Sequence, residues 1–140
     1  MKVLGYIRDF ISDDCRNHLP GVVGIVDQIT ANSMIAHAEF SNDYIDALTN
    51  GSNTNLSAGL AIAINDMGLF FNPSLLRDEA GYVGGSLRAQ LMILLHELGH
   101  FTGAFGSNDN DQGDQAKIDA NNNLIKQHCG AMIDAATVIP

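Results

Sequence analysis

Basic residues are scarce in this sequence, and their scarcity limits the partners it can have. Lysine and arginine together number 7, against 16 aspartates and glutamates, so the formal net charge is −9 at pH 7. Proteins that bind nucleic acids need a basic surface to neutralise phosphates, and no basic stretch is present here. The same charge balance disfavours attachment to an anionic membrane surface. We therefore expect neither a nucleic acid nor a membrane among the partners.

Long apolar runs and structure-breaking tracts are missing as well. The longest uninterrupted apolar stretch, residues 91–95, is far too short to cross a bilayer. Near the N-terminus, Arg8 and Asp9 interrupt an apolar run too early for a secretory signal. Only three prolines occur, and 46% of the residues are hydrophobic, which argues against disorder. No linker-like tract divides the chain, so we expect residues 1–140 to form a single domain.

Only two cysteines are present, Cys15 and Cys129, and they lie far apart in the sequence. Their spacing excludes a CxxC redox motif and a zinc ribbon. Two interpretations remain open at this point. The cysteines are either buried free thiols of a cytosolic protein, or one disulfide that joins the beginning of the chain to its end. In the chain-entropy model, a disulfide that closes so long a loop contributes on the order of 4 kcal/mol to stability.

The hydrophobic pattern predicts helices at both ends of the chain and short strands between them. Apolar residues recur at helical spacing over residues 4–11 and again after Pro20, which suits the first turn of a helix. From Ser86, a good N-cap, to about Thr102 the residues are apolar on most faces, which is typical of a central, buried helix. A loop rich in Asn, Asp and Gly at 107–114 precedes the last helix. Short strands are predicted for residues 34–40, 60–65 and 69–71.

The predicted buried helix contains an HExxH motif, His96-Glu97-Leu98-Gly99-His100. Residues i and i+4 of a helix project from the same face, so the two imidazoles can bind one metal ion. Glu97 is placed to hold a metal-bound water, whose pKa zinc lowers toward 7, and to take its proton as the water attacks a carbonyl. The alternative is a pair of core histidines with Glu97 in a salt bridge, which needs partners for three polar groups in an apolar helix.

At these residues the chain resembles the zincin metallopeptidases, whose active-site helix carries HExxH. The match extends over residues 96–103 as HExxHxxG, but Gly106 stands where the metzincins have a third histidine. No glutamate follows Glu97 in the chain, which excludes a glutamate ligand on the C-terminal side. The resemblance implies one zinc ion per chain, bound by His96 and His100, with Glu97 as the catalytic residue.

The third zinc ligand has to come from elsewhere in the chain. Some zincins use an aspartate, so the resemblance favours an acidic residue from the loop that follows the helix. Asp109 lies nearest to the turn, and we predict it as the third ligand. Asp111 and Asp114 in the same loop are alternatives, and His128 is a further one.

The wider arrangement resembles a group of small bacterial zincin-like proteins. The shared features are an early cysteine, a segment like Gly68-Leu69-Phe70-Phe71, the HExxH helix, an acidic loop and a late cysteine. This resemblance favours a disulfide between Cys15 and Cys129 and an exported protein, secreted or periplasmic, with a cytoplasmic location as the alternative. We expect an α+β, zincin-like fold in which a small, mainly antiparallel sheet packs on the buried HExxH helix, with flanking helices.

These features predict a zinc-dependent hydrolase, in the first place a metallo-endopeptidase. In zincins an extended peptide substrate lies along a sheet edge above the active-site helix, and residues 60–65 or 69–71 are the expected edge. Glu97 would act as base and then as acid toward the leaving amine. Two alternatives stay open: hydrolysis of esters or phosphoesters at the same site, and a catalytically idle binding domain that zinc braces.

Overall fold

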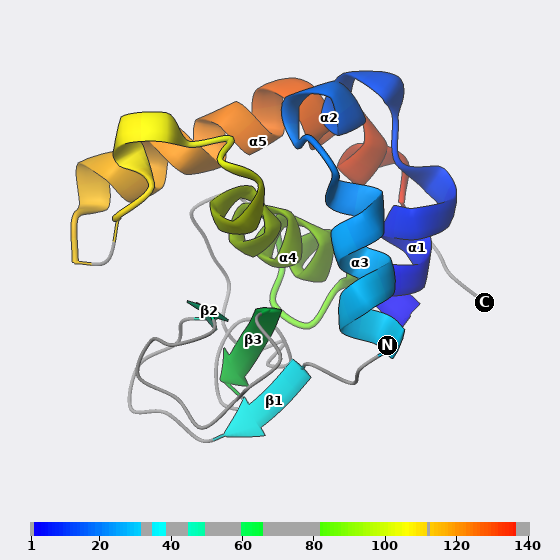
Figure 1. Cartoon of the computed structure of the whole chain (residues 1–140). Coiled ribbons are helices and arrows are strands. Elements are labelled where there is room, and N and C mark those ends of the chain that lie inside the picture. Colours follow the sequence, from blue (N-terminus) through cyan, green and yellow to red (C-terminus); the bar gives the residue numbers. More distant parts are fainter. Residues whose placement is uncertain are drawn as a thin grey trace.

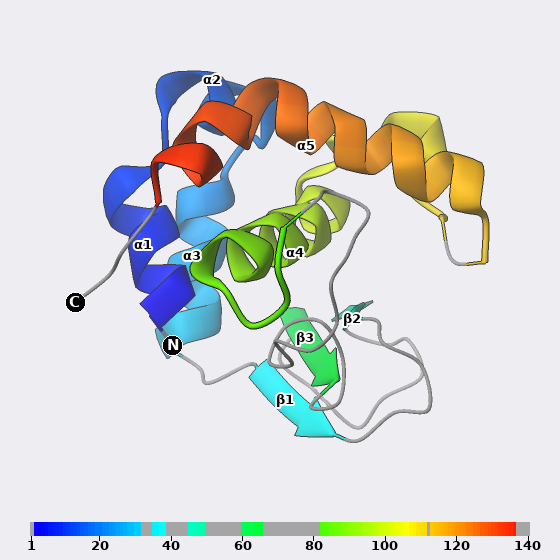
Figure 2. The same cartoon turned by 180° about the vertical axis from the view of Figure 1, so that it is seen from behind.

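The computed structural model describes residues 2–31, 82–111 and 113–136 in full, and the backbone of residues 35–38, 45–49 and 60–65. Within these parts the α-helices are α1 (Lys2–Phe10), α2 (Asp13–His18), α3 (Val22–Ala31), α4 (Leu87–Thr102) and α5 (Gln115–Ala135). A short 3-10 helix, η1 (Gly106–Asn108), lies between α4 and α5. The strands are β1 (Ile35–Ala38), β2 (Ile45–Thr49) and β3 (Leu60–Asn65). In both Figure 1 and Figure 2, α4 lies between α5 and the three strands.

The three strands form a small mixed sheet in the order β1-β3-β2. β3 runs parallel to β1, with Ile62 opposite Ile35, and antiparallel to β2, with Ile62 opposite Ala47. β2 is therefore an edge of this sheet, and it is also the strand that contacts α4. β3 contacts α3, so the sheet closes one side of the helical core.

The expected fold class, α+β with a mainly antiparallel sheet, is wrong. Helices make up 77% of the fully described residues, which contain no strand, so the chain is mainly α-helical. The three described strands have four to six residues each, and one of their two pairings is parallel. The physical reason lies in the fully described residues, where the buried side chains from Val3 to Ala136 come from α1 to α5 and their connections. The predicted strand 69–71 lies outside the described residues.

The expected central helix is confirmed as α4. Ser86 caps its start, because its side-chain oxygen accepts a hydrogen bond from the backbone N–H of Ala89. Four leucines of α4 are completely buried: Leu91, Leu94, Leu95 and Leu98. Burying one such side chain contributes about 1.5–3 kcal/mol to stability. α4 is thus the element on which α1, α3 and α5 pack.

Helices α4 and α5 run antiparallel, and polar contacts hold the end of the pair where α4 begins. The Arg88 guanidinium donates to the backbone carbonyl of Asp134 (2.6 Å), and the Tyr82 hydroxyl donates to the Asp134 carboxylate (2.8 Å). Burial and the hydrogen bond to Asp134 raise the pKa of Tyr82 to about 12, so its hydroxyl keeps its proton. The end of α4, which carries the HExxH histidines, therefore lies beside the start of α5.

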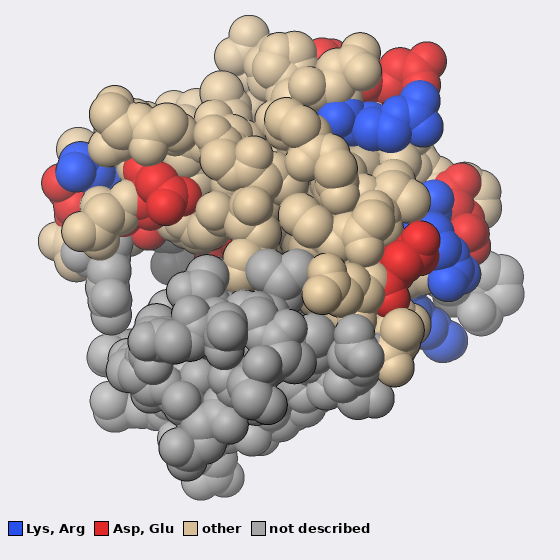
Figure 3. Space-filling model, in the orientation of Figure 1, with Lys and Arg blue, Asp and Glu red and all other residues tan. Residues whose placement is uncertain are grey.

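Two basic side chains of the described surface are paired with neighbouring aspartates. Arg8 lies 3.0 Å from Asp9, and Arg16 pairs with Asp13 across one turn of α2. On the face seen in Figure 3, basic side chains likewise lie next to acidic ones. Such exposed pairs contribute little to stability. Among the described helices, none combines the length and apolar character needed to span a bilayer.

A disulfide joins Cys15 of α2 to Cys129 of α5, as one of the two interpretations of the cysteines predicted. Both cysteines are buried in the hydrophobic core. The bond connects positions 114 residues apart, so it ties the N-terminal helices to the C-terminal one. The alternative of two free thiols is therefore wrong.

Replacing both cysteines by alanine is expected to lower the free energy of unfolding by about 2–5 kcal/mol, because the unfolded chain is no longer cross-linked. Urea unfolding of the two proteins measures this difference. A reductant should shift the midpoint of the wild type and leave that of the double variant unchanged. A wild-type midpoint that does not respond to full reduction would contradict the stabilising role of the bond.

Candidate metal centre

The end of α4 and the loop after it bring the site together. His96 and His100 lie one turn apart in α4, with ring centroids 5.1 Å from each other. Gly103 ends the helix in a left-handed conformation (φ 76°), which glycine adopts without strain. Helix η1 follows and returns the chain toward α4, so that the loop aspartates reach the two imidazoles.

The carboxylate of Asp111 faces both histidines. Its Oδ2 atom lies 3.0 Å from Nε2 of His96 and 3.4 Å from Nε2 of His100. The three atoms all lie within 4.8 Å of one another. Ligands bound tetrahedrally to zinc at 2.0–2.1 Å stand about 3.3 Å apart. The two distances from Asp111 to the imidazoles therefore fit two edges of a zinc tetrahedron.

The other nitrogen of each imidazole meets an oxygen acceptor. Nδ1 of His96 lies 2.7 Å from the amide oxygen of Asn122, and Nδ1 of His100 lies 3.0 Å from the Asp109 carboxylate. An acceptor at this position keeps a proton on Nδ1, so Nε2 is the nitrogen that can exchange its hydrogen bond to Asp111 for a metal. Both rings are therefore held with Nε2 directed at Asp111.

Asp111 is itself fixed from α5. The Asn121 amide donates to the Asp111 carboxylate and to the backbone carbonyl of Asn108, at 2.9 Å in both cases. Burial alone raises the pKa of Asp111, but the hydrogen bonds from His96 and Asn121 and the nearby imidazoles outweigh it. The pKa therefore lies below its usual value, and the carboxylate stays ionised as a metal ligand requires.

An aromatic ring forms one wall of the site. Phe105 is buried, and its ring centroid lies 5.2 Å from that of His96 and 5.0 Å from that of His100. The ring packs against Gly99, where an added Cβ would clash with it. The glycine inside the motif thus makes room for Phe105 directly beneath the two imidazoles.

The predicted residues are brought together in part. His96 and His100 converge as their spacing predicted, and Glu97 between them is buried, with 6% of its surface exposed. The structure groups Asp111 with the two Nε2 atoms, whereas Asp109 contacts only Nδ1 of His100 and is half exposed. The preference for Asp109 came from chain distance alone, which cannot show which nitrogen an aspartate faces.

The other candidate ligands have different roles. The side chain of Asp114 caps the start of α5 by accepting from the backbone N–H of Lys117, and this occupies its oxygen away from the histidines. His128 lies on α5 beside Asp14 of α2. Sequence reasoning missed Asn121 and Asn122. The sequence did contain a signal for them, because asparagine is unfavourable in the interior of a helix and its presence there indicates a specific contact.

The substitution Gly99→Ala tests the packing beneath the imidazoles. The new methyl group must displace the Phe105 ring, and we expect a loss of about 1–3 kcal/mol in the free energy of unfolding. Gly130→Ala is the matched control, because a Cβ there meets nothing closer than 3.9 Å and gains about 0.5–1 kcal/mol of helix stability. Thermal unfolding measures both. Equal effects of the two substitutions would contradict the packing role of Gly99.

Comparison of the chain with protein-family models, with curated proteins and with solved structures finds no match. The interpretation of the site therefore depends on its own geometry. That geometry places two imidazole nitrogens and one carboxylate oxygen around a single point, on the described residues of α4 and the loop before α5.

Proposed function

We propose that the chain binds a Zn²⁺ ion through Nε2 of His96, Nε2 of His100 and the Asp111 carboxylate, and that it is a zinc-dependent hydrolase. The observation that carries the proposal is that both Nε2 atoms face one largely buried carboxylate while both Nδ1 atoms are held by oxygen acceptors. Structural histidines in a core need hydrogen-bond partners, but their Nε2 atoms need not face the same carboxylate. This argues against the reading of His96 and His100 as structural residues.

The donor set supports zinc and leaves room for chemistry. Two imidazoles and one carboxylate are ordinary zinc ligands, and catalytic zinc sites use three protein ligands with the fourth position open. When bound, zinc lowers the pKa of a coordinated water to about 7 and polarises a carbonyl. Asn122 and Asp109 orient the rings, and Asn121 orients the carboxylate.

Glu97 is the proposed proton carrier. It follows His96 in α4, so its side chain points about 100° around the helix from the ligand face. Burial beside the site restricts its contact with bulk water. In this position Glu97 takes the proton of the attacking water and then delivers it to the leaving group.

A peptide is the first substrate class to test, because the resemblance at the HExxH helix implies it. β3 is paired on both sides, so residues 60–65 cannot offer the free edge expected from the sequence, and residues 69–71 lie outside the described part. β2 stands at the edge of the described sheet and contacts α4. Because α4 lies between the strands and α5 (Figure 1), β2 lies on the side of α4 away from the α5 residues of the site. The disulfide supports an exported location, since such bonds persist in oxidising compartments.

The matched pair Asp111→Ala and Asp109→Ala identifies the third ligand. Loss of a ligand should reduce zinc affinity more than about 100-fold, whereas loss of a half-exposed ring partner should cost about 10-fold. Competition with a chromogenic chelator at fixed pH measures both. Asp119→Ala is the control, because Asp119 is exposed and bonds Gln115. A larger loss in Asp109→Ala would assign the ligand role to Asp109, and no loss in either would refute the aspartate ligand.

The substitution Glu97→Gln tests the chemistry. It keeps the size of the side chain and removes its capacity as a base, so zinc should remain bound while hydrolysis falls by about 10²–10⁴-fold. The assay uses peptide, ester and phosphoester substrates with the zinc-loaded protein, and the chelated wild type is the blank. Cleavage of esters or phosphoesters alone would favour the second class of hydrolase. A zinc-loaded wild type that cleaves none of them would leave the idle, zinc-braced domain as the function.

A further inference from the structure

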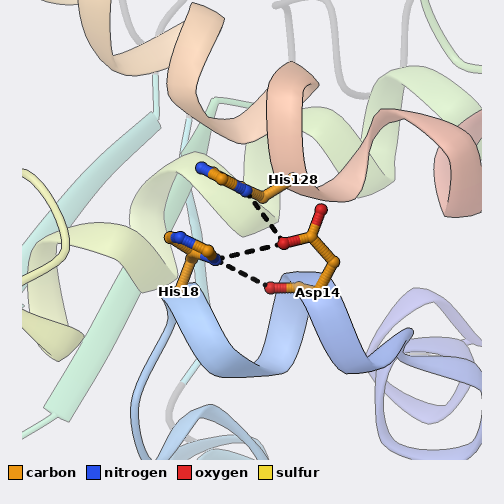
Figure 4. A group of neighbouring side chains, drawn as sticks. All are labelled: Asp14, His18 and His128. Carbon is orange, nitrogen blue, oxygen red and sulfur yellow. Dashed lines mark hydrogen bonds and ion pairs between the residues drawn. The ribbon is translucent and has the colours of Figure 1, made fainter.

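A second group of two imidazoles and one carboxylate lies farther along α5, where α2 packs on it. His18 and Asp14 come from α2 and His128 comes from α5, and Figure 4 shows both rings directed at the same carboxylate. The rings are stacked, with centroids 3.3 Å apart and planes inclined by 10°. Nothing in the proposed hydrolysis uses these residues.

The ligand atoms of this group are spaced like those of the first site. Oδ1 of Asp14 lies 2.9 Å from Nδ1 of His128 and 3.2 Å from Nδ1 of His18. All three atoms lie within 4.8 Å of one another. The two separations from the carboxylate are close to the edge of about 3.3 Å in a tetrahedral zinc site. The group thus brings two nitrogens and one oxygen together, and one of the nearly parallel rings has to turn for both lone pairs to meet one ion.

Nδ1 of His18 also lies 3.1 Å from the backbone carbonyl of Asp14, so two oxygens of Asp14 face this nitrogen. A divalent ion that replaces the hydrogen bonds to the carboxylate would interact with both Nδ1 atoms and with the Asp14 carboxylate. Asp14 and His18 are about half exposed, so the site is open to solvent on one side, where water can complete the coordination.

The disulfide holds the two halves of this group in place. Cys15 follows Asp14 in the chain and Cys129 follows His128, so the bond joins α2 to α5 directly beside the ligands. His18 stands one helical turn after Asp14 on the same helix. All three side chains therefore extend from backbone that is already fixed, which lowers the entropic cost of binding an ion.

We propose that Asp14, His18 and His128 form a second site for a divalent cation of the zinc type, which joins α2 to α5 beside the disulfide. Imidazole and carboxylate donors suit zinc and its neighbours better than calcium. The chain would then bind two equivalents of Zn²⁺, one at each site. Binding of the second Zn²⁺ ion does not require that the first site catalyse hydrolysis.

Zinc titration of four proteins tests the second site, with Zn²⁺ alone as the probe. The wild type should bind two equivalents. The double variant His96→Ala/His100→Ala should keep one equivalent, and adding His18→Ala to it should weaken that one at least 100-fold. Asp13→Ala in the same double variant is the control, because Asp13 is exposed, pairs with Arg16 and is not part of the group. His128→Ala repeats the test from α5.

The possible stoichiometries separate the two proposals. One equivalent in the wild type and none in His96→Ala/His100→Ala would overturn the second site and leave the proposed function intact. One equivalent that only His18→Ala or His128→Ala removes would support the second site and refute the first.

Cu²⁺ offers an independent readout. Its electron paramagnetic resonance spectrum in the His96→Ala/His100→Ala variant should show two coupled imidazole nitrogens, and one after His18→Ala. An unchanged spectrum would overturn the proposal.

Removal of the disulfide tests how the second site is held. In Cys15→Ala/Cys129→Ala, combined with His96→Ala/His100→Ala, α2 is free to move relative to α5 and no new thiol ligand is created, and we expect zinc affinity to fall at least 10-fold. Circular dichroism checks that the variant keeps its helices. Unchanged affinity in a folded variant would show that the disulfide does not position Asp14 and His128.

Discussion

The burial of α4 is the constraint on which the rest of the structure depends. A helix that is apolar on most faces must be covered on every side, and here α1, α3, α5 and the edge strand β2 all contact it. Its only large concentration of polar groups is the HExxH motif near its end, where the chain leaves the core. Those groups have to be satisfied locally, since the leucines around them offer no partners.

The loop after α4 and the start of α5 satisfy these groups. The turn at Gly103 sends the chain back over the helix end, and Asp111 then reaches both Nε2 atoms. Two asparagines that begin the buried face of α5 fix Nδ1 of His96 and the Asp111 carboxylate, and Asp109 fixes Nδ1 of His100. Because each histidine nitrogen has an assigned partner, the rings are oriented before any ion arrives, and little entropy is lost on binding.

The disulfide stabilises the region where α2 packs on α5, as the burial of α4 stabilises the centre of the molecule. It holds the short helix α2 on α5, although α2 itself buries only Cys15. A helix of six residues is marginal without tertiary support. The same bond sets the spacing of Asp14 and His128, so a stabilising cross-link and a proposed cation site share one piece of backbone.

The sequence by itself determined the buried helix with its N-cap at Ser86, the facing of His96 and His100, and the turn at Gly103, because these follow from local helical periodicity and backbone freedom. Only the tertiary structure decided that Asp111 rather than Asp109 faces both Nε2 atoms. Which of these two loop residues faces the histidines depends on the path of the whole loop. That path depends on how α5 packs on α4. The mixed sheet and the mainly helical fold were decided in the same way, since strand pairing depends on contacts between segments distant in the chain. The meeting of His18 with His128 across α2 and α5 likewise needs the folded core and its disulfide, which no local pattern encodes.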